Sequence, residues 1–221
     1  MTGQWRICAA IAGNSLRLER RAGEALLVVA PFGAVALLIV PMAVGTDVPL
    51  LRQLGPGMYW AVVLLFGVLV ILRQSARQTP AQDRLLTLAG VPGATGLLGN
   101  AMATAVLLLV FGGVLAPVTV VLYDPGLRGW PWFLVVLPGV AAGLALLGVI
   151  ADALVRWLEA RSTLGPLLIV PLAVPLLLGA TQTLEGVASG VSPLPWLLLI
   201  LTVDLTLFLA VLLAGHLLDV T

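Results

Sequence analysis

The sequence predicts an all-α integral membrane protein with six transmembrane helices, and two observations carry this prediction. Hydrophobic residues make up 61% of the 221-residue chain and gather in long blocks, while the basic residues fall mainly in alternate gaps between the blocks. The predicted spans are about 25–44, 54–72, 97–122, 131–151, 164–184 and 193–215. At a rise of about 1.5 Å per residue, each block can cross the roughly 30 Å of bilayer hydrocarbon. The connections are too short to fold alone, so residues 1–221 are expected to form a single membrane domain.

The distribution of arginine predicts the orientation of the chain. All eleven basic residues are arginines, and nine of them precede the first span or lie in the second-to-third and fourth-to-fifth connections. These nine are Arg6, Arg17, Arg20, Arg21, Arg73, Arg77, Arg84, Arg156 and Arg161. Basic residues near span ends are retained on the cytosolic side, so the N- and C-termini are both predicted to be cytosolic.

Residues 1–24 are predicted to form an interfacial helix ahead of the first span. No Ala-x-Ala cleavage site follows the first apolar block, so this block is expected to be retained and not removed as a signal peptide. One helical face of the segment carries Trp5, Cys8, Ala12 and Leu16. Its membrane-proximal end carries Arg17, Arg20 and Arg21. Trp5 and these three arginines are therefore candidate interfacial anchors.

The connection between the second and third spans contains a predicted short cytosolic helix, residues 80–89. Thr79 can cap this helix, Pro80 suits its first position, and Gln82 completes a capping box. Its apolar stripe comprises Ala81, Leu85 and Leu88, and its polar residues include Asp83 and Arg84. An isolated helix of this length is marginal in water, so the stripe needs a cover. The cover is either the membrane surface, as for a simple connector, or a soluble subunit that docks there.

The fifth and sixth spans hold the residues least expected in a bilayer. Pro171 and Pro175 lie one helical turn apart and each removes a backbone donor, so a bend and a candidate hinge are predicted. Asp204 lies near the middle of the sixth span, where an ionised carboxylate is costly unless it faces protein or water. We interpret Asp204 either as lining a polar pathway or subunit seam, or as an acid paired with a nearby Thr or Gln.

The sequence contains no motif for catalysis or metal binding. Cys8 is the only cysteine and His216 the only histidine, which excludes Cys-x-x-Cys-His and HExxH motifs. The absence of lysine excludes a phosphate loop that ends in Gly-Lys-Ser/Thr. Ser189 and His216 are predicted on opposite sides of the membrane, which argues against a serine hydrolase. No catalytic residue and no metal site are therefore predicted, and the pattern favours the membrane subunit of a multi-part transporter.

Three segments carry a resemblance to a known family. They are Gly55-Pro56-Gly57 followed by Trp60, the run Asp83-Arg84-Leu85-Leu86, and the aliphatic run 167–177 that contains both hinge prolines. In these segments, and from end to end, the chain resembles the CcmB family of the cytochrome c maturation system. The resemblance implies an ABC-2-like permease bundle of the bacterial inner membrane, with residues 80–89 as its coupling helix. The candidate ATPase-coupling residues are then Thr79, Pro80, Asp83, Arg84, Leu85 and Leu88.

The resemblance also implies a function and a set of partners. It implies a likeness to haem exporter subunits that form a homodimer, carry a CcmA-like ATPase and associate with CcmC-like and CcmD-like membrane proteins. ATP hydrolysis in the partner is then coupled to haem export, or to release of a haem-loaded CcmE-like chaperone. On this reading the chain is not an enzyme, binds no cofactor of its own, handles haem as cargo and uses ATP only through its partner. No nucleic-acid partner is expected.

Three alternatives are compatible with the same residues. An ABC-2 type permease for another substrate, such as a lipid or a drug, has the same topology and docking helix. A scaffold that moves nothing and only binds CcmC-like partners is the second. An intramembrane enzyme is the third, and it is disfavoured because no paired acids, metal ligands, or nucleophile and base share one face.

Overall fold

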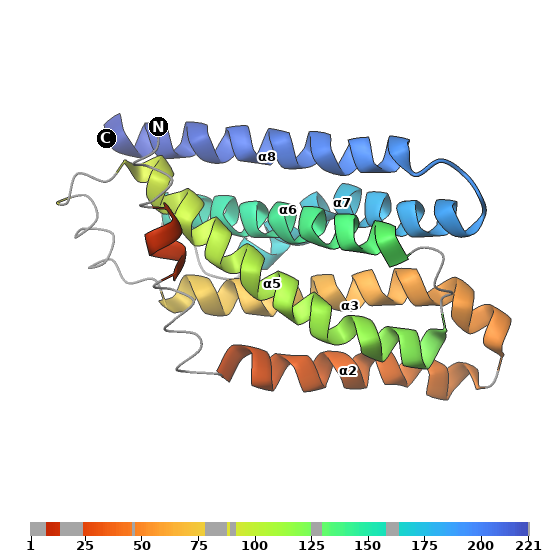
Figure 1. The fold of residues 1–221 in the computed structure, drawn as a ribbon. Helices are drawn as coiled ribbons and strands as arrows, with labels where there is room; N and C mark the ends of the chain where they lie inside the picture. Colours follow the sequence, from red (N-terminus) through yellow and green to blue (C-terminus); the bar gives the residue numbers. More distant parts are fainter. Residues whose placement is uncertain are drawn as a thin grey trace.

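The structure is a computed structural model that describes residues 8–13, 24–45, 47–77, 88, 92–124, 130–157 and 164–220. Its long helices are α2 (Glu24–Val44), α3 (Val48–Arg77), α5 (Gly93–Tyr123), α6 (Trp130–Trp157), α7 (Leu164–Ala188) and α8 (Leu194–Val220). Residues 8–13 form a further short helix. The long helices run roughly along one common direction (Figure 1). The prediction of an all-helical bundle is confirmed for the described residues.

Length and composition identify the helices that can cross a membrane. Five described segments qualify, namely Val48–Ala76, Gly93–Tyr123, Pro131–Val155, Gly165–Ala188 and Leu194–His216. The helix α2 corresponds to the first predicted span, but its apolar part, Val28–Val44, is shorter than the other five. The described chain therefore has five candidate spans and one shorter apolar helix beside them.

Two predicted loops are partly helical in the structure. Residues 185–192 were expected to be a loop, yet α7 continues to Ala188. Residues 47–53 were expected to be another, yet α3 already begins at Val48. The backbone N–H of Leu50 donates to Oδ1 of Asp47 over 3.3 Å, which satisfies one of the unpaired donors of the first helical turn. Asp47 therefore lies at the helix start, and Arg52 and Gln53 lie inside α3.

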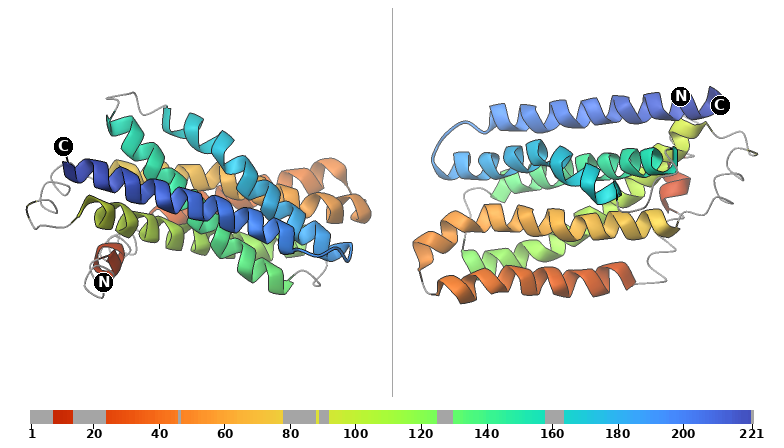
Figure 2. Two further views of the ribbon diagram at one scale, coloured as in Figure 1. Left: turned by 90° about the horizontal axis from the view of Figure 1, so that it is seen from above. Right: turned by 180° about the vertical axis from the view of Figure 1, so that it is seen from behind.

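The bundle has two ends that differ in what they carry. The short 8–13 helix, the C-terminal ends of α3 and α8, and the N-terminal ends of α2 and α5 lie at one end, which we call the termini end (Figures 1 and 2). The turns from α2 to α3 and from α7 to α8 lie at the other, which we call the opposite end. The connection between α3 and α5, which contains the predicted coupling helix, therefore belongs to the termini end.

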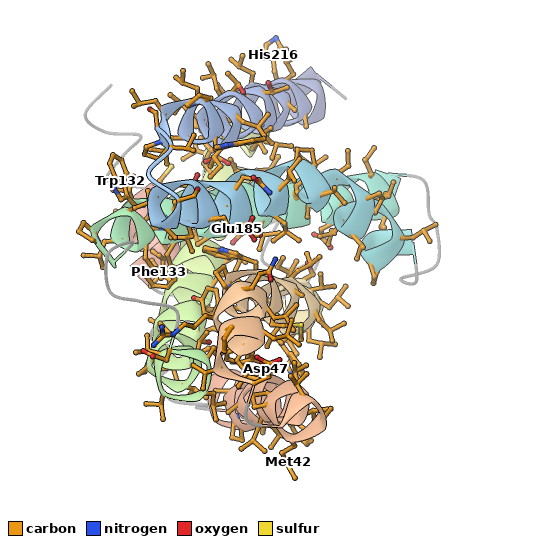
Figure 3. The ribbon with its side chains drawn as sticks, turned by 90° about the vertical axis from the view of Figure 1, so that its right-hand side faces the viewer. Met42, Asp47, Trp132, Phe133, Glu185 and His216 are labelled. Atoms are coloured by element: carbon orange, nitrogen blue, oxygen red, sulfur yellow. The ribbon has the colours of Figure 1, made fainter. Side chains whose placement is uncertain are left out.

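The helix α6 is the most enclosed of the candidate spans. Within its apolar stretch 61% is buried, compared with 11% for α8. Figure 3, which looks at the opposite end of the bundle, shows α2 and α8 at its two edges with the other helices between them. The largest fully buried side chains include Trp60, Phe111, Leu144 and Leu176, so the core extends across α3, α5, α6 and α7. In lipid such packing stabilises a bundle through van der Waals contact more than through the hydrophobic effect.

Hydrogen bonds and an ion pair connect α2, α3 and α5 near the opposite end. The Tyr123 hydroxyl donates to the backbone carbonyl of Leu37 over 2.8 Å, which connects α5 to α2. Arg52 near the start of α3 forms an exposed ion pair with Asp124, the residue that follows α5. Exposed ion pairs contribute at most about 1 kcal/mol, so the buried tyrosine hydrogen bond is the stronger of these two connections.

Candidate functional site

The predicted coupling helix lies almost wholly outside the described residues. Five of its candidate residues are not described, namely Thr79, Pro80, Asp83, Arg84 and Leu85. Leu88 is described, and it is helical and 84% exposed. The helices on either side of the connection are placed, because α3 ends at Arg77 and α5 begins at Gly93.

A polar crevice opens inside the bundle next to this connection. It is formed by the last turns of α3 and α6 and by the first turns of α5. Its polar lining comprises Gln74, Ser75, Asn100, Thr104 and Asp152, and the rest of the lining is apolar or glycine. The Thr104 hydroxyl donates to the carbonyl of Asn100 over 3.0 Å, and Gln74 is buried. Among the described residues, the lining includes one carboxylate and no cationic side chain.

Asp204 lies against α6 of its own chain. Its Oδ1 is buried, and it has no hydrogen-bond partner among the residues that the structure describes. The predicted pairing with a Thr or Gln is therefore not found for this oxygen. The carboxyl group fits because residue 143 is glycine: a Cβ there would meet Oδ1 of Asp204 and would lie 2.6 Å from Cδ1 of Leu176. Asp204 thus occupies a gap in the α6 surface, and α6, not a second subunit, buries this oxygen.

The same gap brings the candidate hinge close to Asp204. Pro171 and Pro175 both lie inside the continuous helix α7, Pro171 exposed and Pro175 half-buried. Leu176 follows Pro175 directly and is fully buried, and it contacts the gap that holds the Asp204 carboxyl. Three helices, α6, α7 and α8, therefore meet at Gly143. The bend at the prolines stays a prediction.

The predicted interfacial anchors Trp5, Arg17, Arg20 and Arg21 lie outside the described residues. Part of the same segment is described and packs against protein. Cys8 and Ala12 are 4% and 5% exposed, and the Cys8 thiol donates to the backbone carbonyl of Thr95 over 3.5 Å. The apolar face predicted for this segment is therefore buried at these two positions, and Cys8 lies against the first turns of α5.

An aromatic cluster in the core was not predicted. The rings of Tyr59 and Trp60 lie 4.8 Å apart in an edge-to-face arrangement, and Phe133 lies 5.4 Å from Tyr59. The Tyr59 hydroxyl donates to the backbone carbonyl of Gly112 over 2.9 Å, whereas the Trp60 indole nitrogen is buried with no partner among the described residues. The adjacent Tyr and Trp in one span were the only sequence signal. The cluster joins α3 to α6 and, through Gly112, to α5.

Metal ligands do not gather anywhere in the described part of the chain. No group of three or more His, Cys, Asp or Glu side chains is close enough there to hold an ion. His216, on α8, is exposed, as Figure 3 also shows. The described geometry thus consists of packing contacts, one buried carboxyl oxygen and a small crevice with polar lining residues.

Comparison with known proteins identifies the family. The family model described as "CcmB protein" matches residues 6–220. The Heme exporter protein B of Bradyrhizobium diazoefficiens is 26% identical over 186 residues, which cover 82% of each chain. The Heme exporter protein B of Haemophilus influenzae is 26% identical over 188 residues, again with 82% of each chain covered. Because the family model matches nearly the whole length, the chain belongs to the CcmB family.

Proposed function

We propose that this chain is the permease subunit of an ABC-type haem exporter that serves cytochrome c biogenesis. The observation that carries the proposal is the match to the CcmB family over residues 6–220, supported by two relatives named Heme exporter protein B. An alternative substrate such as a lipid or drug lacks a comparable observation. The chain itself is not catalytic, and haem is its cargo, either directly or on a chaperone.

For the topology, we propose that the chain crosses the membrane six times and has both termini in the cytosol. The helix α2 has 21 residues, which at about 1.5 Å each make about 31 Å, enough to cross the hydrocarbon. The short 8–13 helix and the C-terminal end of α8 lie at the same end of the bundle, which an even number of crossings requires. The arginine distribution then places the termini end in the cytosol of a bacterial inner membrane.

The partners follow from the same proposal. Two copies of the chain form a homodimer that carries a CcmA-like ATPase, which docks on the coupling helix 80–89. CcmC-like and CcmD-like membrane proteins associate with the dimer, and a CcmE-like haem chaperone is released on the outer side. Leu88, which is 84% exposed, is available to such a partner.

The mechanism we propose begins at the coupling helix and ends in the bundle core. Nucleotide binding displaces the connection between α3 and α5, and these two helices move with it because they flank it. They border α6 at the polar crevice, and α6 contacts Asp204 and Leu176 at Gly143. The prolines of α7 let that helix bend in response, since each of them removes a backbone hydrogen bond.

Replacing Asp204 by Leu tests whether its carboxyl group serves this movement. Leucine is apolar and of similar width, so the fold and ATPase binding should persist while cytochrome c maturation falls by roughly tenfold or more. Asp204→Asn keeps the shape and a polar head, and it serves as the control for packing. The readouts are the yield of assembled complex and the amount of mature cytochrome c. Normal cytochrome c maturation in the Asp204→Leu variant would show that the carboxyl group has no role in this movement.

Co-purification tests the proposed function as a whole. The tagged chain, expressed in its own host and solubilised gently, should bring down a small ATPase together with CcmC-like protein, identified by mass spectrometry. Recovery of an ATPase without haem-handling partners would overturn the haem assignment and leave a permease for another substrate. Recovery of CcmC-like protein without an ATPase would favour a scaffold instead.

A further inference from the structure

The first turns of α5 are held from two sides. On one side, Cys8 donates to the backbone carbonyl of Thr95 and Ile11 packs on Gly99, and Ala12 of the same short helix is buried as well. On the other side, Gly215 of α8 lies so close that a Cβ at this position would be 2.6 Å from Cβ of Ala94. Segments from near the two ends of the chain therefore converge on the helix that follows the coupling connection.

The two sides differ in strength. The α8 contact brings a glycine against backbone atoms of Ala94, and it belongs to a helix of 27 residues. The N-terminal contact brings Cβ and Cγ2 of a single side chain, Ile11, against Gly99. Its buried side chains are small, namely Cys8 and Ala12, and one thiol hydrogen bond accompanies them. The N-terminal side is therefore the one that can open locally.

Glycine at position 99 makes the N-terminal contact possible. A Cβ on residue 99 would lie 2.9 Å from both Cβ and Cγ2 of Ile11, and 3.4 Å from the carbonyl oxygen of Cys8. The helix α5 also carries Gly113, and a Cβ added at this residue would meet no atom within 4 Å. Position 99 thus accommodates the short helix, and position 113 provides a matched site where the same substitution is harmless.

We propose that the short 8–13 helix is a clasp on α5 that is closed in the resting complex and opens when nucleotide displaces the coupling connection. This inference rests on the proposed function and extends it, since it adds a moving element outside the membrane core. Displacement of the connection moves the first turns of α5, where the Cys8 thiol donates to Thr95 and Ile11 packs on Gly99. The α8 side, through Gly215, moves with α5 and does not separate from it.

Cys8 reports the state of the clasp directly. It is the only cysteine of the chain and is 4% exposed. Burial also raises the pKa of its thiol, which lowers the thiolate fraction and slows reaction with maleimide. Ala9, the next residue, is exposed. The double variant Cys8→Ala/Ala9→Cys therefore moves the single thiol to the exposed side of the same helix.

The experiment labels this thiol with polyethylene-glycol maleimide in the complete complex, in membranes, and reads the mass shift of the tagged chain alone. Without nucleotide, Cys8 should react at least about tenfold more slowly than the Cys8→Ala/Ala9→Cys control, a ratio equivalent to about 1.4 kcal/mol. Trapping with Mg-ATP and orthovanadate should raise the Cys8 rate at least about threefold and leave the control unchanged. Gly99→Ala should make Cys8 react fast without nucleotide, and Gly113→Ala should behave as the wild type.

Two results would overturn the clasp. If Cys8 reacts as fast as the control without nucleotide, the contact does not form in the membrane. If Cys8 stays slow in every nucleotide state while the same sample hydrolyses ATP, the contact is a fixed support. A sample with no co-purifying ATPase would instead overturn the proposed function, and it would overturn nucleotide-driven opening as well. This holds even if Cys8 is protected in the wild type and exposed in Gly99→Ala. ATP turnover, measured in parallel, separates these cases.

Discussion

Aspartate at both Leu85 and Leu88 is expected to detach the ATPase from this chain. The two residues lie on the apolar stripe predicted for the coupling helix, and Leu88 is 84% exposed and so available to a partner. Burying a leucine contributes about 1.5–3 kcal/mol, so losing both and adding two charges should weaken ATPase binding by roughly 100-fold or more. Pull-down of the ATPase with the tagged chain and ATP turnover of the purified complex measure the effect.

Two acidic residues on the polar side of the same helix, at Gln82 and Thr87, provide the control. Gln82→Glu/Thr87→Asp adds the same charge within the same segment, keeps the capping box because Glu also suits it, and leaves the apolar stripe intact, so it should retain the ATPase. Unchanged pull-down and unchanged ATP turnover with the Leu85/Leu88 variant would place the docking surface elsewhere. Loss with both variants would indicate that charge alone, not the stripe, controls binding.

Gly215→Val is expected to destabilise the whole bundle. A Cβ at position 215 would lie 2.5 Å from the backbone nitrogen of Ala94, and backbone atoms in a helix cannot move aside as a flexible side chain can. The helices α5 and α8 must separate, at a cost of about 1–3 kcal/mol or more. In a chain of this size such a loss lowers the melting temperature by roughly 3–10 °C, measurable by thermal unfolding in detergent.

Gly113→Ala is the matched control for Gly215→Val. Position 113 lies within α5, and a Cβ there meets nothing within 4 Å. Alanine favours a helix over glycine by about 0.8–1 kcal/mol, so the melting temperature should stay the same or rise slightly. A Gly215→Val chain that melts at the wild-type temperature would mean that α5 and α8 are not packed this closely in the membrane.

The helices could be predicted from the sequence because they depend on residues close to one another in the chain. Long apolar runs give the helices, because a chain in lipid must satisfy its backbone hydrogen bonds internally. The face through Cys8 and Ala12 was likewise visible in the spacing, and both residues are buried. The start of α3 was predicted too late, although Asp47 followed by Pro49 is a recognisable helix-start pattern and Asp47 does accept from the Leu50 N–H.

The contacts within the candidate site could not be predicted from the sequence, because each joins residues far apart in it. Asp204 could be flagged as an unusual intramembrane acid, but only the packed bundle shows that Gly143 makes room for its carboxyl group. The sequence predicted that the helical face with Cys8 lies on the membrane surface. In the structure the Cys8 thiol instead donates to the backbone carbonyl of Thr95, 87 residues away. Periodicity identifies a face to be covered and does not identify what covers it.

The connections at the opposite end make that end a pivot. Tyr123 joins α5 to α2 by its hydrogen bond to Leu37, and the Arg52–Asp124 ion pair joins α3 to α5. With 31 residues, α5 is about 46 Å long, so a sideways displacement of about 5 Å at its termini end tilts it by only about 6°. Because these three helices are joined at the opposite end, they should tilt together about that end. Most of the movement is then expected at the termini end, while the opposite end rotates without separation of its helices.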